Sequence, residues 1–292
     1  MNSELRARLI LFEIIEGGTE FWSDQISHHG VEEVVARLEN RFFDPVKFQK
    51  LYERYLHVNP ERTLEKIESC GARLLTPHDE DWPLSLSDLS SPPIALVYKG
   101  DSSLLRSPSV AIVGTRNPTP YGVRNAQEFA AGFVDRGWTI TSGGAYGIDS
   151  AAHKGALIAE GSTIAVLASG LDIAYPAGNV RLFAEIADSG ILISEVLPGT
   201  PAIPARFLTR NRVIAALSRA TLVVEAAFRS GSLRTAHDAA ELMRLVMAIP
   251  GPISSPTSEG CHRLIGERAA ELVTSVSDAA ELLSRLDETI SQ

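Results

Sequence analysis

Alternation between short apolar runs and amphipathic stretches dominates residues 109–249 of the sequence. The apolar runs cover residues 109–113, 138–141, 163–167, 191–194, 221–224 and 245–249. Helical periodicity lies between most of them, at residues 121–135, 150–159, 180–187, 211–217 and 233–243. Strands that are apolar on both faces are typical of parallel sheets covered by helices on both sides. The pattern therefore predicts an α/β fold with a doubly wound, mostly parallel sheet.

The sequence on either side of this block is organised differently. Residues 1–70 carry apolar residues at helical spacing and no strand pattern, which predicts a small helical domain. Residues 72–76 and 94–98 have the pattern of two further short strands. We expect the sheet domain to cover residues 71–268 and a short helical tail to follow over residues 269–292.

Charge and composition limit the classes of function. The formal net charge of −9 argues against a broadly basic protein that coats nucleic acid. Between residues 109 and 251, however, twelve cations nearly balance eleven carboxylates, and eleven of these cations are arginines, whose planar donors suit phosphate. No apolar run is long enough for a transmembrane helix. The first residues also lack the basic region and the following apolar region of a secretory signal peptide. We therefore expect a cytoplasmic protein without membrane contacts.

Glycines and small polar residues follow the predicted parallel strands. The most informative segment runs from Trp138 to His153 and reads WTITSGGAYGIDSAAH, a strand, a glycine turn and a helix start. Glycines let the backbone approach a ligand closely, and a helix start offers unpaired N–H groups to an anion. Because parallel strands end at one edge of a sheet, these loops predict one large anion-binding site at that edge.

Arginines lie beside these loops in the sequence. They are Arg116, Arg206, Arg210, Arg212 and Arg229. Most exposed arginines are solvated surface charges, but Arg116, Arg212 and Arg229 stand next to Gly, Ser or Asn donors, which favours a ligand-binding role. The Ser-Gly-Ser sequence at residues 230–232 adds a second candidate phosphate nest at a helix start.

Catalytic and cofactor interpretations find less support. Asp149 and His153 are four residues apart, hence on one helix face near Ser142, but no Gly-x-Ser-x-Gly elbow accompanies them. Metal binding by Asp149, His153 and Asp172 is no better supported. The sequence lacks the Gly-x-Gly-x-x-Gly fingerprint of nicotinamide-cofactor binding and the acidic residue that would bind the ribose. We therefore expect no catalytic residues, no metal and no cofactor.

Ordered motifs across residues 70–265 give the sequence a family resemblance. They are Gly114-Thr-Arg-Asn with Tyr121-Gly122, the 142–153 segment, Gly170-Leu-Asp172, Tyr175-Pro176-x-x-Asn179, Arg210-Asn-Arg-Val-Ile-Ala215, and Glu225-Ala with Ser230-Gly-Ser232. Together they resemble the DNA-processing protein A family (DprA, also called Smf). Residues 1–70 also look like the helical (SAM-like) N-terminal domain of that family.

The resemblance implies an extended Rossmann-like domain without enzymatic activity. Such a protein binds single-stranded DNA, forms a homodimer and loads the RecA recombinase during natural transformation. The motifs imply DNA or phosphate contacts at Arg116, Ser142, Gly143, Gly144, Gly147, Asn179, Arg181, Arg210, Asn211, Arg212, Arg229, Ser230, Gly231 and Ser232.

The sequence departs from the family pattern at three places. Ala177 stands where a basic residue is common, and Arg181 is the expected substitute. Leu208 follows Phe207 where the family usually has proline. Many relatives carry a C-terminal winged-helix domain, for which residues 269–292 are too few.

Three functions remain to be distinguished. The first is a non-catalytic mediator of recombination that binds single-stranded DNA. Its candidate stacking side chains are Tyr146, Tyr175, Phe207 and Phe228. The alternative is a Rossmann-like nucleotide-binding enzyme that cleaves N-glycosidic bonds, for which Glu195 and Glu225 are the candidate carboxylates at strand ends. The third is a protein-interaction scaffold whose sheet edge binds no ligand.

Overall fold

Four helices form a compact N-terminal part within residues 1–70. The structure is a computed structural model that describes residues 1–290, with side chains up to residue 285. They are α1 (Ser3–Ile14), α2 (Glu20–Glu39), α3 (Gln49–Tyr55) and α4 (Pro60–Ser69). Asn2 and Asn59 cap α1 and α4, since each side chain accepts a hydrogen bond from the backbone three residues later, at 2.8 and 2.9 Å. Trp22 and Phe43 pack edge to face in the core of this part, with ring centroids 4.9 Å apart.

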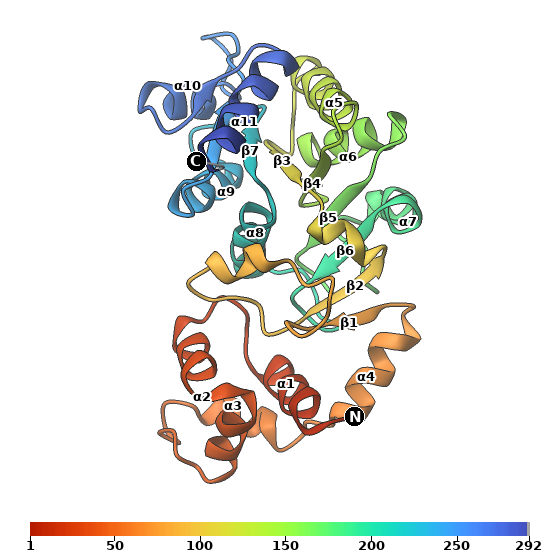
Figure 1. The fold of residues 1–292 in the computed structure, drawn as a ribbon, viewed down its shortest axis with the longest axis vertical. Helices are drawn as coiled ribbons and strands as arrows, with labels where there is room; N and C mark the ends of the chain where they lie inside the picture. The colour runs from red at the N-terminus through yellow and green to blue at the C-terminus, as the bar shows by residue number, and fades with distance from the viewer. Residues whose placement is uncertain (291–292) are drawn as a thin grey trace.

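One sheet of nine strands forms the centre of the described chain (Figure 1). Its strands are β1 (Arg73–Leu75), β2 (Leu96–Gly100), β3 (Ser109–Val113), β4 (Thr139–Ser142), β5 (Thr163–Leu167), β6 (Ile191–Ser194), β7 (Ala220–Val223), β8 (Leu245–Ala248) and β9 (Glu271–Leu272). They lie in the order β1-β2-β6-β5-β4-β3-β7-β8-β9. Strand β2 is antiparallel to both β1 and β6, and every pair from β6 to β9 is parallel. The predicted α/β fold with a mostly parallel, doubly wound sheet is confirmed.

Helices cover both faces of this sheet (Figure 1). They are α5 (Pro120–Val134), α6 (Ile148–Ile158), α7 (Val180–Ser189), α8 (Pro204–Leu217), α9 (Gly231–Glu241), α10 (Glu259–Gly266) and α11 (Val276–Ile290), with 3₁₀ turns η1 (Leu84–Asp88), η2 (Ser102–Arg106) and η3 (Ala177–Asn179). Val110 and Ile112 of β3 pack with α5 and α6, whereas Ala111 and Val113 pack with α8 and α9. The strand is therefore apolar on both faces because both faces are covered. None of the helices within residues 1–290 has the length and apolarity to cross a bilayer.

The N-terminal helices share a core with one edge of the sheet, below it in Figure 1. Phe12 of α1 and Ile67 of α4 pack against Val97 of β2. Arg8 is buried at this junction, where its Nη1 donates to the Ile94 carbonyl at 2.7 Å. These contacts fix α1 against the sheet, so the segment after α1 has a defined place beside the carboxyl ends of the strands.

The parallel strands β3 to β8 lie within one residue of their predicted bounds. Helix α8 differs most, because it begins at Pro204 and not at the predicted residue 211. Proline is well suited to the first turn of a helix, but the polar residues that follow it weaken the apolar periodicity of this stretch. The sheet also continues past the predicted boundary at residue 268, since β9 pairs with β8 through Met247 and Glu271.

Candidate nucleic-acid interface

A cavity of about 560 Å³ opens at the carboxyl ends of β3 and β7. From β3 the chain proceeds to β4, β5 and β6 on one side, and then returns to β7 and β8 on the other. The sheet therefore has its topological switch point between β3 and β7, where loops diverge and ligands of doubly wound folds bind. The loops after β3 and β7 line this cavity together with one face of α8.

An aromatic ring with two arginines beside it lies at this cavity, and we call the group the Phe207 cluster (Arg116, Tyr175, Phe207 and Arg210). The Cζ atoms of Arg116 and Arg210 lie 4.7 and 5.9 Å from the Phe207 ring centroid. The Tyr175 ring tilts against the same ring, with centroids 5.5 Å apart. Arg116 and Tyr175 are exposed, whereas Arg210 is buried. The cluster combines charge and stacking surface, which a single-stranded nucleic acid requires.

Arg210 is a buried cation with unused hydrogen-bonding capacity. Burial lowers its pKa to about 10, which the Asp149 carboxylate opposes and Arg116 reinforces, so the guanidinium stays charged at neutral pH. Its Nε is buried and finds no hydrogen-bond partner among the described residues. An unsatisfied buried donor costs about 1–3 kcal/mol. The guanidinium thus keeps its charge at the cavity wall without a hydrogen-bonded counter-ion at Nε.

Asp149 is the only carboxylate among the described residues that line the cavity. Burial raises its pKa, while Arg210 and the Ala145 backbone N–H, which donates to Oδ2 at 3.3 Å, act in the opposite direction. The Asp149 carboxylate balances Arg210 below the surface. Arg116 remains as the exposed cation at the cavity mouth.

The glycine turn between β4 and α6 shapes the cavity from behind. Gly144 and Gly147 have φ of +70° and +84°, in the left-handed region that favours glycine. A Cβ on Gly147 would overlap the Thr115 carbonyl oxygen, and one on Gly143 would overlap Arg210 Nη1. The three glycines, predicted to contact phosphate, do not line the cavity. They allow the turn, the Arg116 loop and the Arg210 side chain to pack closely.

Ser142 and Asn179, also predicted as contact residues, support the turn and do not line the cavity. The Ser142 hydroxyl is fully buried and donates to the Ile112 carbonyl at 2.6 Å. The Asn179 amide donates to the Gly144 carbonyl at 2.9 Å and to Ser150 Oγ at 2.8 Å. Ser142 thus ties the end of β4 to β3, and Asn179 holds the backbone of the turn.

The N-terminus of α9 forms another wall of the cavity. All three predicted nest residues, Ser230, Gly231 and Ser232, line it. Ser230 caps the helix by accepting from the Ser232 N–H at 3.4 Å, and Asn211 of α8 donates to the Gly231 carbonyl at 3.2 Å. Arg229 precedes them on the exposed loop. A helix N-terminus beside Arg116 and Arg210 concentrates positive potential at the cavity.

Arg212 and Arg181 do not line this cavity, and their predicted contact with DNA stays a prediction. Arg212 is two positions from Arg210 on α8, and residues two apart do not share a helix face. Its Nη1 donates to the Ser91 carbonyl and its Nη2 to Glu195 Oε2, each at 2.7 Å. Arg181 is exposed on α7 and does not line the cavity.

The two candidate catalytic carboxylates are engaged in structural contacts. Glu225 is 2% exposed and accepts hydrogen bonds from the Thr119 N–H at 2.9 Å, the Thr119 hydroxyl at 2.7 Å and the Thr257 hydroxyl at 3.1 Å. Glu195 is bound to Arg212. Neither carboxylate lines the cavity at the switch point.

Asp149 and His153 have separate partners. His153 Nδ1 lies 2.7 Å from Thr163 Oγ1, and burial together with Arg210 lowers the His153 pKa to about 3. An imidazole with this pKa stays neutral in the folded protein. Among the described residues, no group of three or more His, Cys, Asp or Glu side chains gathers as metal ligands would.

Asn117, Leu208 and Thr235 line the cavity although the sequence did not single them out as site residues. Thr235 lies one turn after Ser232 on α9, so helical periodicity from the predicted nest is the signal that finds it. Leu208 follows Phe207 in the part of α8 that the apolar pattern did not predict as helix.

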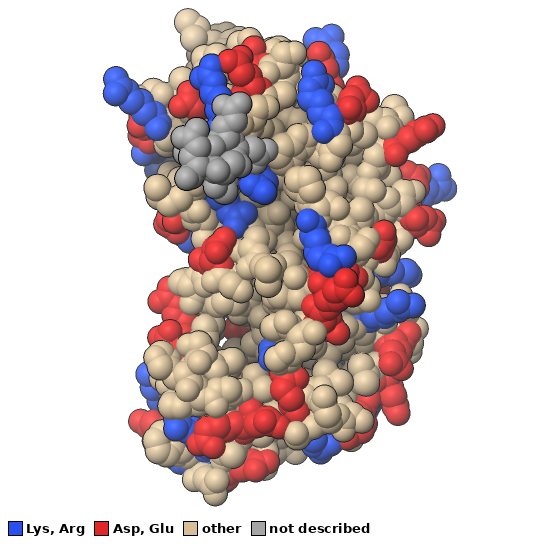
Figure 2. Space-filling model, viewed as in Figure 1, with Lys and Arg blue, Asp and Glu red and all other residues tan. Residues whose placement is uncertain are grey.

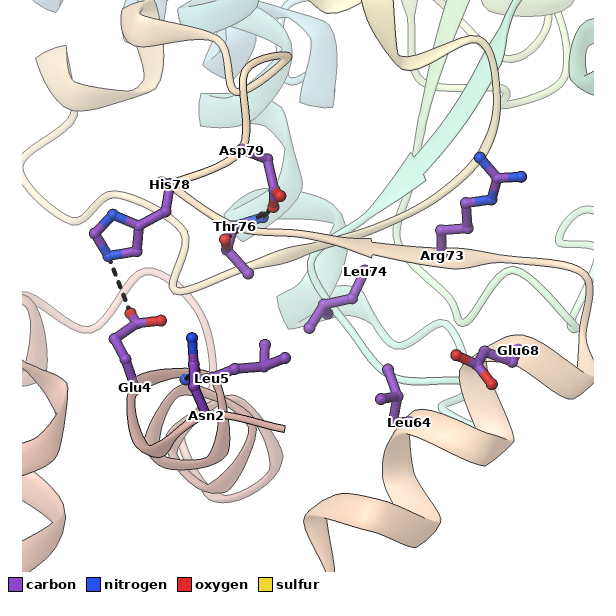
Figure 3. A pocket seen from close by; sticks show the side chains of 10 residues that line it. All are labelled: Asn2, Glu4, Leu5, Leu64, Glu68, Arg73, Leu74, Thr76, His78 and Asp79. Carbon is purple, nitrogen blue, oxygen red and sulfur yellow. Dashed lines mark hydrogen bonds and ion pairs between the residues drawn. The ribbon is translucent and has the colours of Figure 1, made fainter.

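A separate cavity of about 530 Å³ lies between α1, α4 and β1 (Figure 3). Its charged lining includes Glu4, Glu68 and Asp79 against Arg73. Glu4 Oε1 lies 3.2 Å from Nε2 of His78. Carboxylates repel phosphate groups, so this cavity suits a nucleic-acid backbone less well than the cavity at the switch point.

Charges of both signs are mixed over the molecular face in Figure 2. Lys and Arg side chains stand among Asp and Glu side chains on this face. A broad basic surface is the usual basis of strong nonspecific binding to nucleic acid. The face in view therefore offers no broad basic surface to a nucleic acid.

Comparisons with known proteins match most of the chain to one protein family. The family model of DNA recombination-mediator protein A matches residues 73–284. The DNA processing protein DprA of Streptococcus pneumoniae is 44% identical over 226 residues, which are 77% of this chain and 79% of that protein. A relative from Mycobacterium tuberculosis is 44% identical over 238 residues, which are 77% of this chain and 61% of that protein. This chain thus spans less than two thirds of the Mycobacterium relative.

Solved structures agree with the sequence comparison. The X-ray structure of DNA processing protein A from Streptococcus pneumoniae superposes with a TM-score of 0.83 and 33% identity, over 96% of this chain and 98% of that one. DNA processing protein A from Helicobacter pylori, whose structure was described for its single-stranded DNA binding mode, gives a TM-score of 0.67 and 31% identity over 75% and 96%. The chain therefore belongs to the DNA recombination-mediator protein A (DprA/Smf) family.

Proposed function

We propose that this protein binds single-stranded DNA in the cavity at the β3–β7 switch point and acts as a mediator of recombination. The observation that carries the proposal is the Phe207 cluster, where two arginines flank an aromatic ring beside a helix N-terminus. Single strands offer both phosphates and unstacked bases, and this cavity offers a partner for each. The single-stranded DNA binding described for the Helicobacter pylori relative supports the same ligand.

The finer parts of the proposal rest on family membership. The protein forms a homodimer and loads RecA onto DNA taken up in natural transformation, and the RecA partner places this activity in the cytoplasm. Purified protein, RecA and a single strand already covered by single-strand-binding protein test this directly. RecA filament formation is faster with the protein than without it. An unchanged rate overturns the loading role while leaving DNA binding to be measured separately.

The protein binds DNA without catalysing a reaction on it. Glu225 has three hydrogen-bond donors around it and Glu195 is paired with Arg212, so neither carboxylate is available at the cavity. Incubation with nucleoside monophosphates tests the alternative of N-glycosidic cleavage. We expect no released base above the rate without protein. Release that disappears in an Asp149→Asn variant would establish the enzyme instead, because Asp149 is the carboxylate that does line the cavity.

Fluorescence anisotropy with a labelled oligonucleotide tests the binding site. Arg116→Ala removes the exposed cation of the Phe207 cluster and weakens binding by about tenfold or more, since hydrogen bonds to charged groups contribute about 1.5–3 kcal/mol. Arg136→Ala is the matched control. Arg136 precedes β4 at the amino edge of the sheet, so the same loss of charge there leaves the affinity unchanged.

Two outcomes contradict different parts of the proposal. Equal affinities of wild type and Arg116→Ala rule out the assigned site. Absence of binding at low salt rules out the function, because electrostatic attraction to the strand is greatest there.

A further inference from the structure

Glu225 is a buried carboxylate beside the switch point that does not itself line the cavity. It follows β7, and the described residues surround it with hydrogen-bond donors and join it to no cation. Burial of a carboxylate is costly unless such donors compensate for the lost water. They come from Thr119, after β3, and from Thr257, after β8. The carboxylate therefore fixes the loops of two neighbouring strands relative to β7.

Glu225 holds both ends of the loop that carries Arg116. This loop, residues 114–119, connects β3 to α5. Near its start, the Thr115 N–H donates to the backbone carbonyl of Glu225 at 2.7 Å. At its end, the Thr119 N–H donates to Oε2 at 2.9 Å and the Thr119 hydroxyl donates to Oε1 at 2.7 Å. Arg116 lies between these two attachments, so the position of its backbone depends on both.

The start of α5 is shaped to receive the Glu225 carboxylate. Thr119 caps this helix by accepting from the Gly122 N–H at 3.3 Å, while its own hydroxyl proton points to Glu225. A Cβ on Gly122 would overlap Oε2 of Glu225. The positive end of a helix stabilises a nearby negative charge. The missing side chain at Gly122 and the N-terminus of α5 thus give an ionised carboxylate a defined place.

The Arg116 guanidinium depends on this loop for its position. Its Cζ lies 4.7 Å from the Phe207 ring centroid, and it has no hydrogen bond or ion pair with another described residue. A cation–π contact of an exposed side chain is weak, so the backbone from which Arg116 extends decides where its charge lies. We propose that Glu225 is a positioning residue for DNA binding, which keeps Arg116 beside Phe207 at the cavity mouth. The proposal rests on the proposed binding of single-stranded DNA.

Two conservative substitutions separate the contact of Glu225 from its charge. Glu225→Asp keeps the charge, but its shorter side chain withdraws the carboxylate from Thr119. Glu225→Gln loses the charge and keeps an oxygen that accepts from the Thr119 N–H, while its amide nitrogen faces the hydroxyls of Thr119 and Thr257, which can turn to accept. Fluorescence anisotropy with the labelled oligonucleotide compares the two variants with wild type.

The positioning role predicts a loss of affinity in Glu225→Asp only. This variant binds the oligonucleotide about tenfold more weakly, which is the loss expected for Arg116→Ala, and Glu225→Gln binds as wild type does. An effect of charge alone gives the opposite pattern, because removing a carboxylate near a bound polyanion strengthens binding. In that case Glu225→Gln binds more tightly than wild type and Glu225→Asp is unchanged.

A double variant shows whether Glu225 acts through Arg116. Residues that act through one contact are not additive, so Glu225→Asp/Arg116→Ala binds no more weakly than Arg116→Ala alone. The slope of log K against log salt becomes shallower by about 0.7 in Glu225→Asp, as it does in Arg116→Ala. A merely structural role of Glu225 leaves this slope unchanged. A further tenfold loss in the double variant overturns the proposal, because Glu225 then acts through another residue.

Glu13→Asp is the matched control for the shortened carboxylate. Glu13 Oε2 accepts from the Thr63 hydroxyl at 2.6 Å among the N-terminal helices, and Glu13 does not line the cavity at the switch point. The same loss of a contact between carboxylate and threonine there leaves DNA affinity unchanged. Urea denaturation under the conditions of the binding assay shows that each variant is folded when its affinity is measured.

The failure of this proposal differs from the failure of the proposed function. A Glu225→Asp variant that binds as wild type does overturns the positioning role. A Glu225→Gln variant that binds more tightly than wild type overturns it as well, and this result is decisive even if Glu225→Asp does not fold. A wild-type protein that binds no oligonucleotide at low salt overturns the proposed function itself.

Discussion

At Gly143, the absence of a side chain determines where the Arg210 guanidinium lies. A Cβ there would overlap Nη1 of Arg210, so Gly143→Ala must move this guanidinium or the turn. Overpacking in a tightly packed site costs about 1–3 kcal/mol of stability. We expect Gly143→Ala to lower the free energy of unfolding by this amount and to weaken binding of single-stranded DNA, measured by urea denaturation and anisotropy.

Gly266 is the control for this substitution. It lies at the end of α10, where an added Cβ meets no atom within 4 Å. Gly266→Ala leaves both stability and affinity close to those of wild type. If Gly143→Ala binds DNA as well as Gly266→Ala does, the position of Arg210 is not important for binding.

His153 makes stability depend on pH. Burial lowers its pKa to about 3 in the folded protein, whereas the unfolded chain has the ordinary value of 6.5. Between these values the unfolded chain binds a proton that the folded protein does not, so stability falls as pH falls. The slope is about 1.4 kcal/mol per pH unit. His153→Gln removes this titration, while its amide still reaches the position of the imidazole beside Thr163.

Urea denaturation from neutral pH down to about pH 5 measures this effect. The stability difference between wild type and His153→Gln becomes smaller as pH falls below 6.5, because the carboxylates titrate alike in both proteins. A difference that stays constant over this range means that His153 is protonated in the folded protein.

Sequence patterns located some site residues better than others. Arg116 and Ser230 were found because each stands in a loop directly after a strand, and the ends of parallel strands fix the positions of such loops. The sequence did not show where the Ser142 side chain points. Successive residues of a strand face opposite sides of the sheet, and the Ser142 hydroxyl donates to the Ile112 carbonyl. Side-chain direction at such positions depends on packing partners that sequence spacing does not specify.

Helix α8 lies between the cavity at the switch point and a smaller cavity of about 290 Å³ that reaches Leu167 and Glu195. Phe207 and Asn211 line the cavity at the switch point, Ala205 and Thr209 line the smaller one, and Arg210 lines both. Arg212 anchors the helix through Ser91 and Glu195. The strands around this helix were predicted to within a residue from their apolar runs. The start of α8 was not, since a helix that lines two cavities carries polar residues on several faces and has weak periodicity.

The Arg212–Glu195 pair gives a prediction about this anchor. Arg212→Ala leaves the Glu195 carboxylate buried without its cation, and breaking a buried pair costs about 3–5 kcal/mol. We expect a large loss in the free energy of unfolding, measured by urea denaturation. The double variant Arg212→Met/Glu195→Gln recovers much of this loss because no charge remains buried. If the double variant is as unstable as the single one, the pair does not determine the stability of α8.

On the scale of the whole molecule, the net charge of the protein has the same sign as the charge of its proposed ligand. The protein carries −9 and single-stranded DNA is a polyanion, so long-range attraction is weak and binding depends on few contacts. In the proposed complex, Arg116 and Arg210 are the cations beside the strand, while most carboxylates of the chain lie outside residues 109–251. Such a protein should release few counterions when it binds.

The salt dependence of binding measures this number. For single strands the slope of log K against log salt is about −0.7 per neutralised phosphate, so contacts to Arg116, Arg210 and Arg229 give a slope of about −2. Arg116→Ala makes the slope shallower by about 0.7, whereas Arg136→Ala leaves it unchanged because Arg136 lies at the amino edge of the sheet. A wild-type slope near −5 would mean that the strand crosses many more cations than this cavity supplies, and that the DNA-binding surface lies mainly outside it.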